Sequence, residues 1–235
     1  MQVLIPAAGE GKRFSESGYT LAKPYLPIDD KKMLIASALS MNLDAKFIFI
    51  LRQNPQIYDL LNDIQLNFKK ANIKILNEVT EGAADTCLHA TDYLDLDDEL
   101  IIANCDQIMN WDSNRVLNEL RQYNGGLVCI KSNDPKHSYV KLDKNGYATY
   151  IKEKECISEY ALTGIHYWKE ARDFLNSASM MIHSKIKSKN EYYVSETYNL
   201  LIRQGKRIGI SLIENSDIHF IGTPADYETY KNASN

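Results

Sequence analysis

Short apolar runs alternate with amphipathic stretches through the first half of the chain, and this alternation constrains the fold more than any other feature. The runs are continuously apolar, which is typical of strands buried on both faces of a parallel sheet. The stretches between them carry apolar residues at the spacing of a surface helix. Strands alternating with helices predict an α/β fold. The predicted strands of this half are Gln2–Ile5, Lys46–Leu51, Ile73–Leu76 and Leu100–Ala103.

The second half contains strand candidates that follow one another more closely, which predicts antiparallel pairing and so a mixed sheet. No repeat, low-complexity tract or linker-like segment marks a boundary, and we therefore expect one domain over residues 1–235. Ligands of such folds bind where loops leave the carboxyl ends of the strands. The later strand candidates are Leu127–Lys131, Tyr139–Leu142, Ala148–Ile151, Thr163–Trp168 and Arg207–Leu212.

Several helix ends are marked by capping residues. Asn54-Pro55 predicts the N-cap and first residue of a helix that runs to Phe68. Asp112 predicts the cap of the next helix, and Thr223-Pro224 opens the last one. Gly205 is expected to end a helix that begins near Ser195.

The charge balance and the cysteines exclude several classes of protein. With 27 Lys and Arg against 31 Asp and Glu, the net charge of −4 does not favour a nucleic-acid partner, which needs a basic field. No segment approaches the ~20 apolar residues of a membrane span, so we expect no membrane partner. The cysteines lie far apart without a C-x-x-C pair, which indicates neither zinc nor disulfides and favours a reducing cytoplasm. They are Cys87, Cys105, Cys129 and Cys156.

The first strand leads directly into a short segment rich in small residues, glycine and cations. Glycines allow backbone N–H groups to approach an anion closely, and Lys12 and Arg13 add charged donors for phosphate oxygens. The segment is neither a dinucleotide fingerprint nor a P-loop, because Phe14 stands at the third glycine position and no Gly-Lys-Ser/Thr follows. Phosphate binding and a plain strand-to-helix turn both fit the loop alone. Its residues are Ala7, Ala8, Gly9, Glu10, Gly11, Lys12 and Arg13.

Lys23-Pro24 follows about ten residues after this loop, and the combination resembles the opening signature of the sugar-phosphate nucleotidylyltransferases. In that family A-G-x-G-x-R is followed by K-P, and the segment from Ala8 to Arg13 matches the first part. The resemblance covers nearly the whole chain and implies a Rossmann-like α/β/α fold with a mixed, mostly parallel sheet. It also implies that the glycine loop wraps a nucleoside triphosphate, that Arg13 grips its β- and γ-phosphates, and that Lys23 contacts the reaction centre.

Asp106 follows the apolar strand Leu100–Ala103, at the end where a hard cation would be held. The resemblance implies that this carboxylate binds Mg²⁺ together with the triphosphate. Many family members have a second metal-binding Asp two residues before a late Gly-Thr, but Phe220 occupies that position here. Asp217 or His219 could serve instead, or Asp106 and the triphosphate could hold the metal with water.

Further matches follow in the family's order, and the resemblance gives them roles. Asn77 and Gly82 would read the base, although Gly82 could also simply begin a helix. The Glu-Lys pair would bind acceptor hydroxyls through Glu153 and the acceptor phosphate through Lys154, whereas neighbouring Lys152 leaves open which lysine points inward. The acceptor site would also include Ser138, Gly164 and Glu191, and we interpret the adjoining Tyr192-Tyr193 as packing residues.

The resemblance implies attack by an acceptor phosphate oxygen on the α-phosphorus of a nucleoside triphosphate, with release of pyrophosphate and Mg²⁺ as cofactor. The implied partners are that triphosphate and a phosphorylated small molecule, a sugar 1-phosphate, in cell-surface polysaccharide synthesis. Three alternatives stay open: a cytidylyltransferase for a phosphocholine-like acceptor, a glycosyltransferase, and an inactive nucleotide-binding regulator. A glycosyltransferase would use Asp-x-Asp, which Asn104-Cys105-Asp106 lacks. The nucleobase, the acceptor and whether the chain forms a homo-oligomer are not determined by the sequence.

Overall fold

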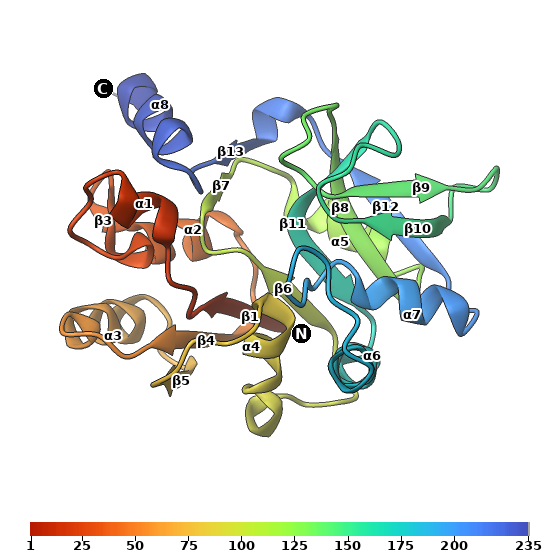
Figure 1. Ribbon diagram of the computed structural model, residues 1–235, viewed down its shortest axis with the longest axis horizontal. Coiled ribbons are helices and arrows are strands. Elements are labelled where there is room, and N and C mark those ends of the chain that lie inside the picture. The colour runs from red at the N-terminus through yellow and green to blue at the C-terminus, as the bar shows by residue number, and fades with distance from the viewer. Residues whose placement is uncertain (235) are drawn as a thin grey trace.

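The computed structural model describes residues 1–234, which form a nine-stranded mixed sheet between two layers of helices (Figure 1). The strands of this sheet are β1 (Gln2–Ala7), β4 (Lys46–Arg52), β5 (Asn72–Leu76), β6 (Leu100–Ala103), β8 (Gly125–Lys131), β9 (Tyr139–Leu142), β10 (Ala148–Lys152), β11 (Tyr160–Trp168) and β12 (Ile208–Leu212). The helices are α1 (Lys12–Glu16), α2 (Met33–Ser40), α3 (Ile57–Asn67), α4 (Ala83–Leu88), α5 (Ser113–Leu120), α6 (Ala171–His183), α7 (Thr197–Arg203) and α8 (Pro224–Ser234). The predicted α/β fold is confirmed; the predicted domain's last residue, Asn235, lies outside the described residues.

The centre of the sheet is parallel, as the apolar runs predicted. Strand β1 pairs in parallel with β4 on one side and β6 on the other. Its side chains alternate between two cores, since Val3 and Ile5 belong to one apolar cluster and Leu4 to the other. Helices α2, α3 and α5 cover the first face, and α4, α6 and α7 cover the second. Burial on both faces explains why this strand is apolar at successive positions.

Two expectations about strands are wrong. Strand β5 ends the sheet order next to β4, and Ile75 is 36% exposed, so this strand is not buried on both faces. Strand β12 pairs in parallel with β8, although we expected antiparallel pairing for the later strands. The chain between β8 and β12 includes α6 and α7 and is therefore long enough to return in the same direction. The antiparallel prediction is confirmed for β8, β9, β10 and β11.

One helix begins later than predicted. The Oδ1 of Asn54 accepts a hydrogen bond from the Gln56 backbone N–H at 2.8 Å, as an N-cap residue does, but Pro55 and Gln56 form a turn before the helix. Helix α3 then begins at Ile57, so the predicted start at Pro55 is wrong. The predicted cap at Asp112 is confirmed, since its carboxylate accepts from the backbone N–H of Arg115 at 3.0 Å.

A break in strand pairing along β11 opens the carboxyl end of the sheet. Residues Ile165–Trp168 pair with β6, and Ala161 pairs with β9 on the same edge, opposite to β8. Leu162, Thr163 and Gly164 lie between these two pairings, where the register along β8 also shifts. Strand β6 ends at this point, so its following loop and this part of β11 lie at a switch in strand order, where α/β folds bind ligands.

The C-terminal segment reaches the same place through a short ribbon. Strands β7 (Gln107–Met109) and β13 (Ile218–Phe220) pair antiparallel, and the Ile221 backbone N–H donates to the Asp106 carbonyl at 3.0 Å. Helix α8 then packs beside α1 (Figure 1), where the rings of Tyr227 and Phe14 meet edge to face with centroids 6.0 Å apart. In the described part of the chain, no helix has the length and apolar character needed to span a membrane.

Candidate active site

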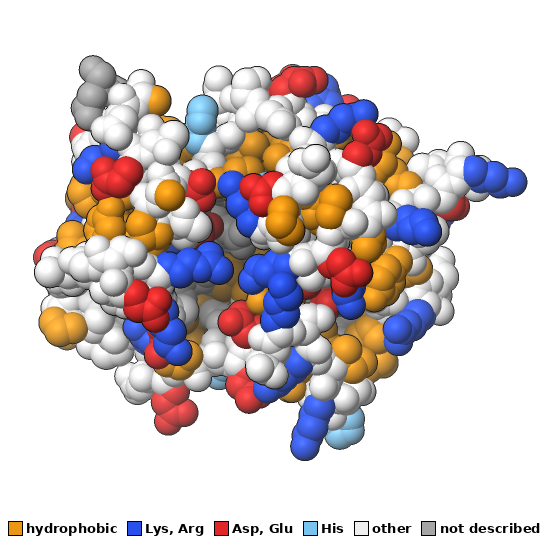
Figure 2. Space-filling view, turned by 45° about the horizontal axis from the view of Figure 1, so that its top comes forward, with side chains coloured by type: hydrophobic (Ala, Val, Ile, Leu, Met, Phe, Trp, Pro, Cys, Tyr) orange, Lys and Arg blue, Asp and Glu red, His pale blue; other side chains and the backbone are white. Residues whose placement is uncertain are grey.

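A cavity of about 900 Å³ lies over the carboxyl ends of β1 and β6. Figure 2 shows Lys and Arg side chains gathered around a hollow near the middle of one face of the molecule. Of the site residues predicted from the sequence, Ala8 and Asn77 do not line the cavity: Ala8 is buried, and Asn77 is exposed outside it. Those that line it are Ala7, Gly9, Glu10, Gly11, Lys12, Arg13, Lys23, Gly82, Asp106, Ser138, Glu153, Lys154, Gly164 and Glu191.

The glycine loop between β1 and α1 forms one wall. No atom lies within 4 Å of the position that a Cβ on Gly9 would take, so the backbone there is open to a ligand. The ammonium of Lys12 pairs with Glu10 at 2.7 Å on the surface. Arg13 is exposed at the cavity, and its guanidinium has no ion pair with any carboxylate of residues 1–234. Of the two cations of this loop, Arg13 is thus the one available to an anion.

Lys23 and Asp106 form an ion pair below this loop, with Nζ 2.7 Å from Oδ2. Burial alone would lower the pKa of Lys23, but the Asp106 carboxylate outweighs it and raises that pKa. Gly222 closes over the same carboxylate, since a Cβ there would lie 2.5 Å from Asp106 Oδ2. This close approach is available only to glycine and leaves the carboxylate at the cavity wall, where it could hold a hard cation.

A second polar group, from the turn after β10, the residue before β9 and the loop before α7, forms the opposite part of the lining. Glu153 is 7% exposed and accepts hydrogen bonds from the hydroxyls of Ser138 and Ser195. Burial raises the pKa of Glu153, an effect that the two hydroxyl donors and the nearby Lys154 partly oppose. Lys154 donates to the hydroxyl of Tyr193 at 3.0 Å. The group offers a carboxylate and a cation to one ligand.

The structure shows which of two lysines faces the cavity and corrects the interpretation of one tyrosine. Lys154 lines the cavity, whereas Lys152 does not. The Lys152 Nζ instead lies 3.9 Å from the Glu155 Oε2. Tyr192 is buried as a packing residue, but the same interpretation is wrong for Tyr193, which lines the cavity and orients Lys154. A tyrosine next to a buried tyrosine carries no sequence signal that distinguishes the two.

Gly164 holds the backbone of β11 in the gap between its two pairings. Its φ of +87° is in a region that favours glycine, and an added Cβ would lie 2.1 Å from Asn104 Nδ2. The Gly164 carbonyl accepts from the Asn104 backbone N–H at 3.2 Å. The glycine therefore permits β11 and the loop after β6 to approach each other at the cavity floor.

The two residues suggested as replacements for a second metal-binding Asp face elsewhere. The Asp217 carboxylate accepts from the Glu214 backbone N–H in a capping turn, and the His219 ring packs on Tyr230. Neither lines the cavity, whereas Phe220 does, with its ring centroid 4.9 Å from that of His137. Another carboxylate at the cavity, Asp226 of α8, accepts from the Thr223 hydroxyl at 2.8 Å.

The sequence reasoning missed several other residues that line the cavity. The hydroxyls of Thr80 and Thr86 lie 2.5 Å apart beside Gly82, the N-cap of α4. His166 of β11 also lines the cavity. These residues lie near Gly82 and Gly164, but a hydroxyl or an imidazole beside a glycine carries no sequence signal that its side chain faces a cavity.

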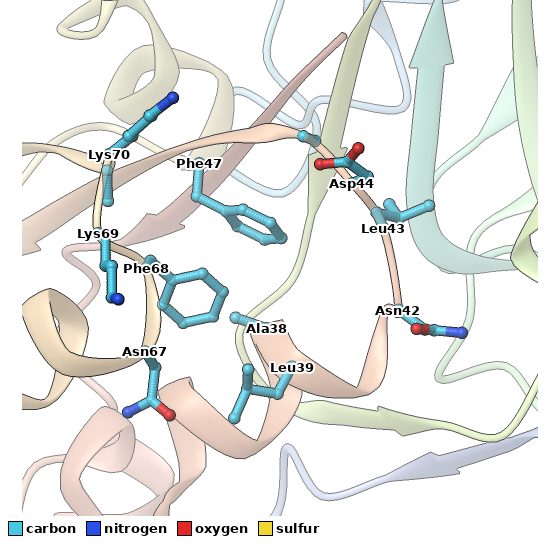
Figure 3. Close-up of a pocket in the computed structure, with 12 residues that line it drawn as sticks. Ala38, Leu39, Asn42, Leu43, Asp44, Phe47, Asn67, Phe68, Lys69 and Lys70 are labelled. Atoms are coloured by element: carbon cyan, nitrogen blue, oxygen red, sulfur yellow. The ribbon is translucent and has the colours of Figure 1, made fainter.

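A separate cavity of about 560 Å³ lies at the amino end of β4 (Figure 3). The rings of Phe47 and Phe68 form its interior, with centroids 4.6 Å apart, and Lys69 and Lys70 stand at its rim. It lies at the opposite end of the parallel strands from Arg13 and Asp106, so it is not part of the candidate site.

Comparisons with known proteins agree with this fold. A family model described as "Nucleotidyl transferase" matches residues 2–213. A nucleoside-diphosphate-sugar pyrophosphorylase from Vibrio cholerae RC9 superposes with a TM-score of 0.88 at 24% identity, covering 98% of this chain and 99% of that one. An inositol-1-phosphate CTP transferase from T. maritima superposes with a TM-score of 0.76 at 15% identity, covering 99% of this chain and 94% of that one. A UDP-glucose pyrophosphorylase complexed with UDP-glucose superposes with a TM-score of 0.78 at 16% identity, covering 99% of this chain and 97% of that one. Comparison with curated proteins gives no match.

Proposed function

The chain belongs to the nucleotidyl transferase family, and from this premise we propose that it joins a nucleoside triphosphate to a sugar 1-phosphate, giving a nucleoside diphosphate sugar and pyrophosphate. The observation that carries the proposal is the meeting of two polar groups in one cavity. Arg13 and Lys23 line it near the glycine loop, and Glu153 and Lys154 line it from the turn that follows β10. The first group suits a triphosphate, and the second suits a phosphorylated polyol.

In the proposed reaction, an oxygen of the acceptor phosphate attacks the α-phosphorus, and the bond to the β-phosphate oxygen breaks. No general base is required, because a phosphate monoester is largely ionised at neutral pH. Arg13 and the loop amides would hold the departing pyrophosphate, Lys23 would neutralise charge at the reaction centre, and Lys154 would align the acceptor phosphate. Catalysis of this kind rests on positioning and charge neutralisation.

The family implies Mg²⁺, and the residues at the site fit this ion. Mg²⁺ binds through one or two carboxylates and completes its shell with phosphate oxygens and water. Asp106 supplies such a carboxylate at the cavity, and no cluster of three or more acidic, His or Cys side chains among residues 1–234 indicates an all-protein metal site. Because Phe220 stands where many members of the resembled family have a second Asp, we assign the metal to Asp106 and the triphosphate. When bound, the ion would neutralise charge on the phosphates.

The acceptor assignment rests on the buried Glu153 group. Glu153 is a hydrogen-bond acceptor held by Ser138 and Ser195, an arrangement suited to sugar hydroxyls. We further propose that the enzyme acts in the cytoplasm and that its product is used in the synthesis of a cell-surface polysaccharide. The nucleobase is not assigned.

Two assays test the proposal. Thermal unfolding with Mg²⁺ and each of ATP, GTP, CTP, UTP and dTTP should show one triphosphate that raises Tm by several degrees, since a ligand at ~100 times its Kd adds ~2.7 kcal/mol. Pyrophosphate release with that triphosphate should then require a sugar 1-phosphate. Lys154→Ala should weaken acceptor use, and Lys152→Ala is the matched control because Lys152 does not line the cavity.

Other outcomes of these assays would contradict the proposal. Pyrophosphate release with phosphocholine but with no sugar 1-phosphate would favour the cytidylyltransferase alternative. Triphosphate binding without release for any acceptor would favour an inactive regulator, for which the Phe220 position is the supporting observation. Equal loss of activity in Lys152→Ala and Lys154→Ala would contradict the role given to Lys154.

A further inference from the structure

Lys136 is a cation at the cavity to which the proposed reaction gives no role. It lies in the loop between β8 and β9, and it lines the cavity together with the next two residues, His137 and Ser138. The side chain of Asp134 holds this loop, since its Oδ1 accepts from the Lys136 backbone N–H at 3.0 Å. The Tyr139 hydroxyl also donates to the Asp134 carbonyl at 2.7 Å. These bonds fix the backbone from which the lysine side chain extends.

The Lys136 ammonium lies over the ring of Phe220. Its Nζ is 5.9 Å from the ring centroid, within the distance at which a cation is attracted to an aromatic face. The His137 ring packs on the same ring, with centroids 4.9 Å apart. Phe220 stands where many members of the resembled family have a metal-binding Asp. In this chain, that position therefore carries an aromatic ring with a positive charge over it instead of a negative charge.

The ion pairs of Lys136 are long and leave its ammonium available to another anion. The Nζ lies 3.5 Å from Asp134 Oδ2 and 3.6 Å from Asp226 Oδ1. Charged hydrogen bonds of this kind are usually about 2.7–2.9 Å long, as in the pair of Lys23 with Asp106 at 2.7 Å. The Lys136 side chain is also 46% exposed, so each pair contributes little to stability. A phosphate in the cavity could therefore replace either carboxylate at this ammonium.

The loop that carries Lys136 lies between the two polar groups of the cavity. On one side, the Ser138 hydroxyl donates to Glu153 of the acceptor group. On the other side, Phe220 pairs with the residue that follows Asp106 in the chain. Lys136 is two residues before Ser138 and over the Phe220 ring, so it lies between the acceptor group and the carboxylate assigned to the metal. In the proposed reaction the acceptor phosphate occupies this space, because its oxygen attacks the α-phosphorus.

The chemistry of a phosphate monoester fits this position. Its phosphoryl group has three acceptor oxygens and a charge of roughly −1.5 to −2 at neutral pH, so one contact with Lys154 leaves further oxygens and charge unmatched. A lysine ammonium is a compact charge with three donors, which suits a phosphate oxygen. Burial and the nearby Lys136 ammonium lower the pKa of His137, so that imidazole is neutral at pH 7. Lys136 therefore supplies the positive charge of this loop.

We propose that Lys136 is a further catalytic residue, which binds an oxygen of the acceptor phosphate together with Lys154 and neutralises its charge as it approaches the triphosphate. This inference rests on the proposed function and deepens it, because it gives the acceptor phosphate a second cation at the place where Phe220 provides no carboxylate. The contact is with the acceptor and not with the triphosphate, so loss of Lys136 should affect the two substrates differently.

The test measures pyrophosphate release by wild type, Lys136→Met and Lys136→Arg with the sugar 1-phosphate that wild type accepts. Lys136→Met should lower kcat/KM for the acceptor by about 10- to 100-fold, the effect of one hydrogen bond to a charged group. Lys136→Arg keeps the charge and should recover most of this loss. Lys131→Met is the matched control and should behave as wild type, because Lys131 is an exposed lysine that pairs with Glu159 at 3.1 Å and does not line the cavity.

A second measurement separates the acceptor from the triphosphate. The rise in Tm that the preferred triphosphate and Mg²⁺ cause without acceptor should be equal in wild type and Lys136→Met, because the lysine does not contact that ligand. Loss of this rise in Lys136→Met would assign the lysine to the triphosphate and overturn the inference.

Three kinetic results would also decide against the inference. Equal kcat/KM for the acceptor in Lys136→Met and Lys131→Met would overturn the role of Lys136 and leave the proposed function intact. A loss in Lys136→Met that Lys136→Arg does not reduce would show that packing, and not charge, is what the residue supplies. Failure of every sugar 1-phosphate to release pyrophosphate with wild type would overturn the proposed function and the inference together.

Discussion

The ion pair between Lys23 and Asp106 allows a prediction whose size follows from the structure. The two charged atoms lie 2.7 Å apart, and the side chains are 24% and 20% exposed. Exposed pairs contribute about 0.2–1 kcal/mol, and loss of one partner of a fully buried pair costs about 3–5 kcal/mol. The exposures lie between these limits, so we expect Asp106→Asn to destabilise the protein by about 1–3 kcal/mol. Much of this cost comes from Lys23, left without a partner close to Arg13, whose charge already disfavours that ammonium.

A double-mutant cycle isolates the pair. Asp106→Asn, Lys23→Met and the double variant are compared by urea unfolding, and we expect a coupling free energy of about 1–3 kcal/mol. For a chain of this length, a change of about 1–3 kcal/mol in the free energy of unfolding shifts Tm by roughly 2–12 °C. Turnover should fall by about 10²–10³ in Asp106→Asn, because a positioned charge at the reaction centre is lost.

The outcomes separate structure from catalysis. Additive effects of the two substitutions on stability would show that the ion pair contributes nothing to folding. A folded Asp106→Asn variant with near-normal turnover would refute the assignment of Asp106 to the metal. If Mg²⁺ still raised the Tm of the nucleotide complex equally in this variant, the metal would bind elsewhere.

Three further predictions follow from single side chains. Arg13→Ala should lower kcat by about 10²–10³ with little change in Tm, because Arg13 is exposed and has no ion pair among the described residues; turnover and Tm measured together check this, and a large fall in Tm would contradict it. Burial raises the pKa of Glu153, so the folded state holds its proton more tightly than the unfolded chain does. The free energy of unfolding of wild type therefore falls as the pH rises above about 4.5. Glu153→Gln should gain stability relative to wild type from pH 4.5 to pH 7, as measured by denaturant titrations across that range. Burial lowers the pKa of His166 from 6.5 to about 3, so wild type should lose about 1.4 kcal/mol per pH unit from this group as the pH falls below 6.5; equal acid slopes for wild type and His166→Asn would contradict this.

The sequence predicted residues whose chemistry is tied to a local pattern. The glycine loop, Lys23 and Asp106 each stand at a strand end or beside a proline, and all of these residues except Ala8 line the cavity. Asn77 was given its role by the family resemblance, through its position five residues before Gly82. Spacing does not determine direction in a loop, and Asn77 is exposed outside the cavity. Hydroxyls of Thr80 and Thr86 line the cavity instead of it, and we predict that they contact the bound nucleotide.

The edge strand β5 shows a similar limit of sequence-based prediction, here for the fold. An apolar run such as Ile73–Leu76 reports affinity for a sheet, but it does not report how many neighbours the strand will have. Strand β5 pairs only with β4 in the described sheet and keeps part of its surface exposed. Strand order depends on the lengths and routes of the connections, and these are set by the packing of the whole chain.

By itself, the sequence determined the α/β class, the parallel centre of the sheet and the glycine and charge pattern of the first loop. These properties follow from periodicity, glycine and charge over short segments, because local backbone preferences and burial on two faces act on neighbouring residues. Only the tertiary structure decided which residues share the cavity floor. Tyr193 turns its hydroxyl to Lys154, Asp217 turns away into a capping turn, and His166 is buried with an unpaired nitrogen below Gly164. Each of these depends on contacts between segments far apart in the chain, whose free energy exists only once the sheet has closed around them.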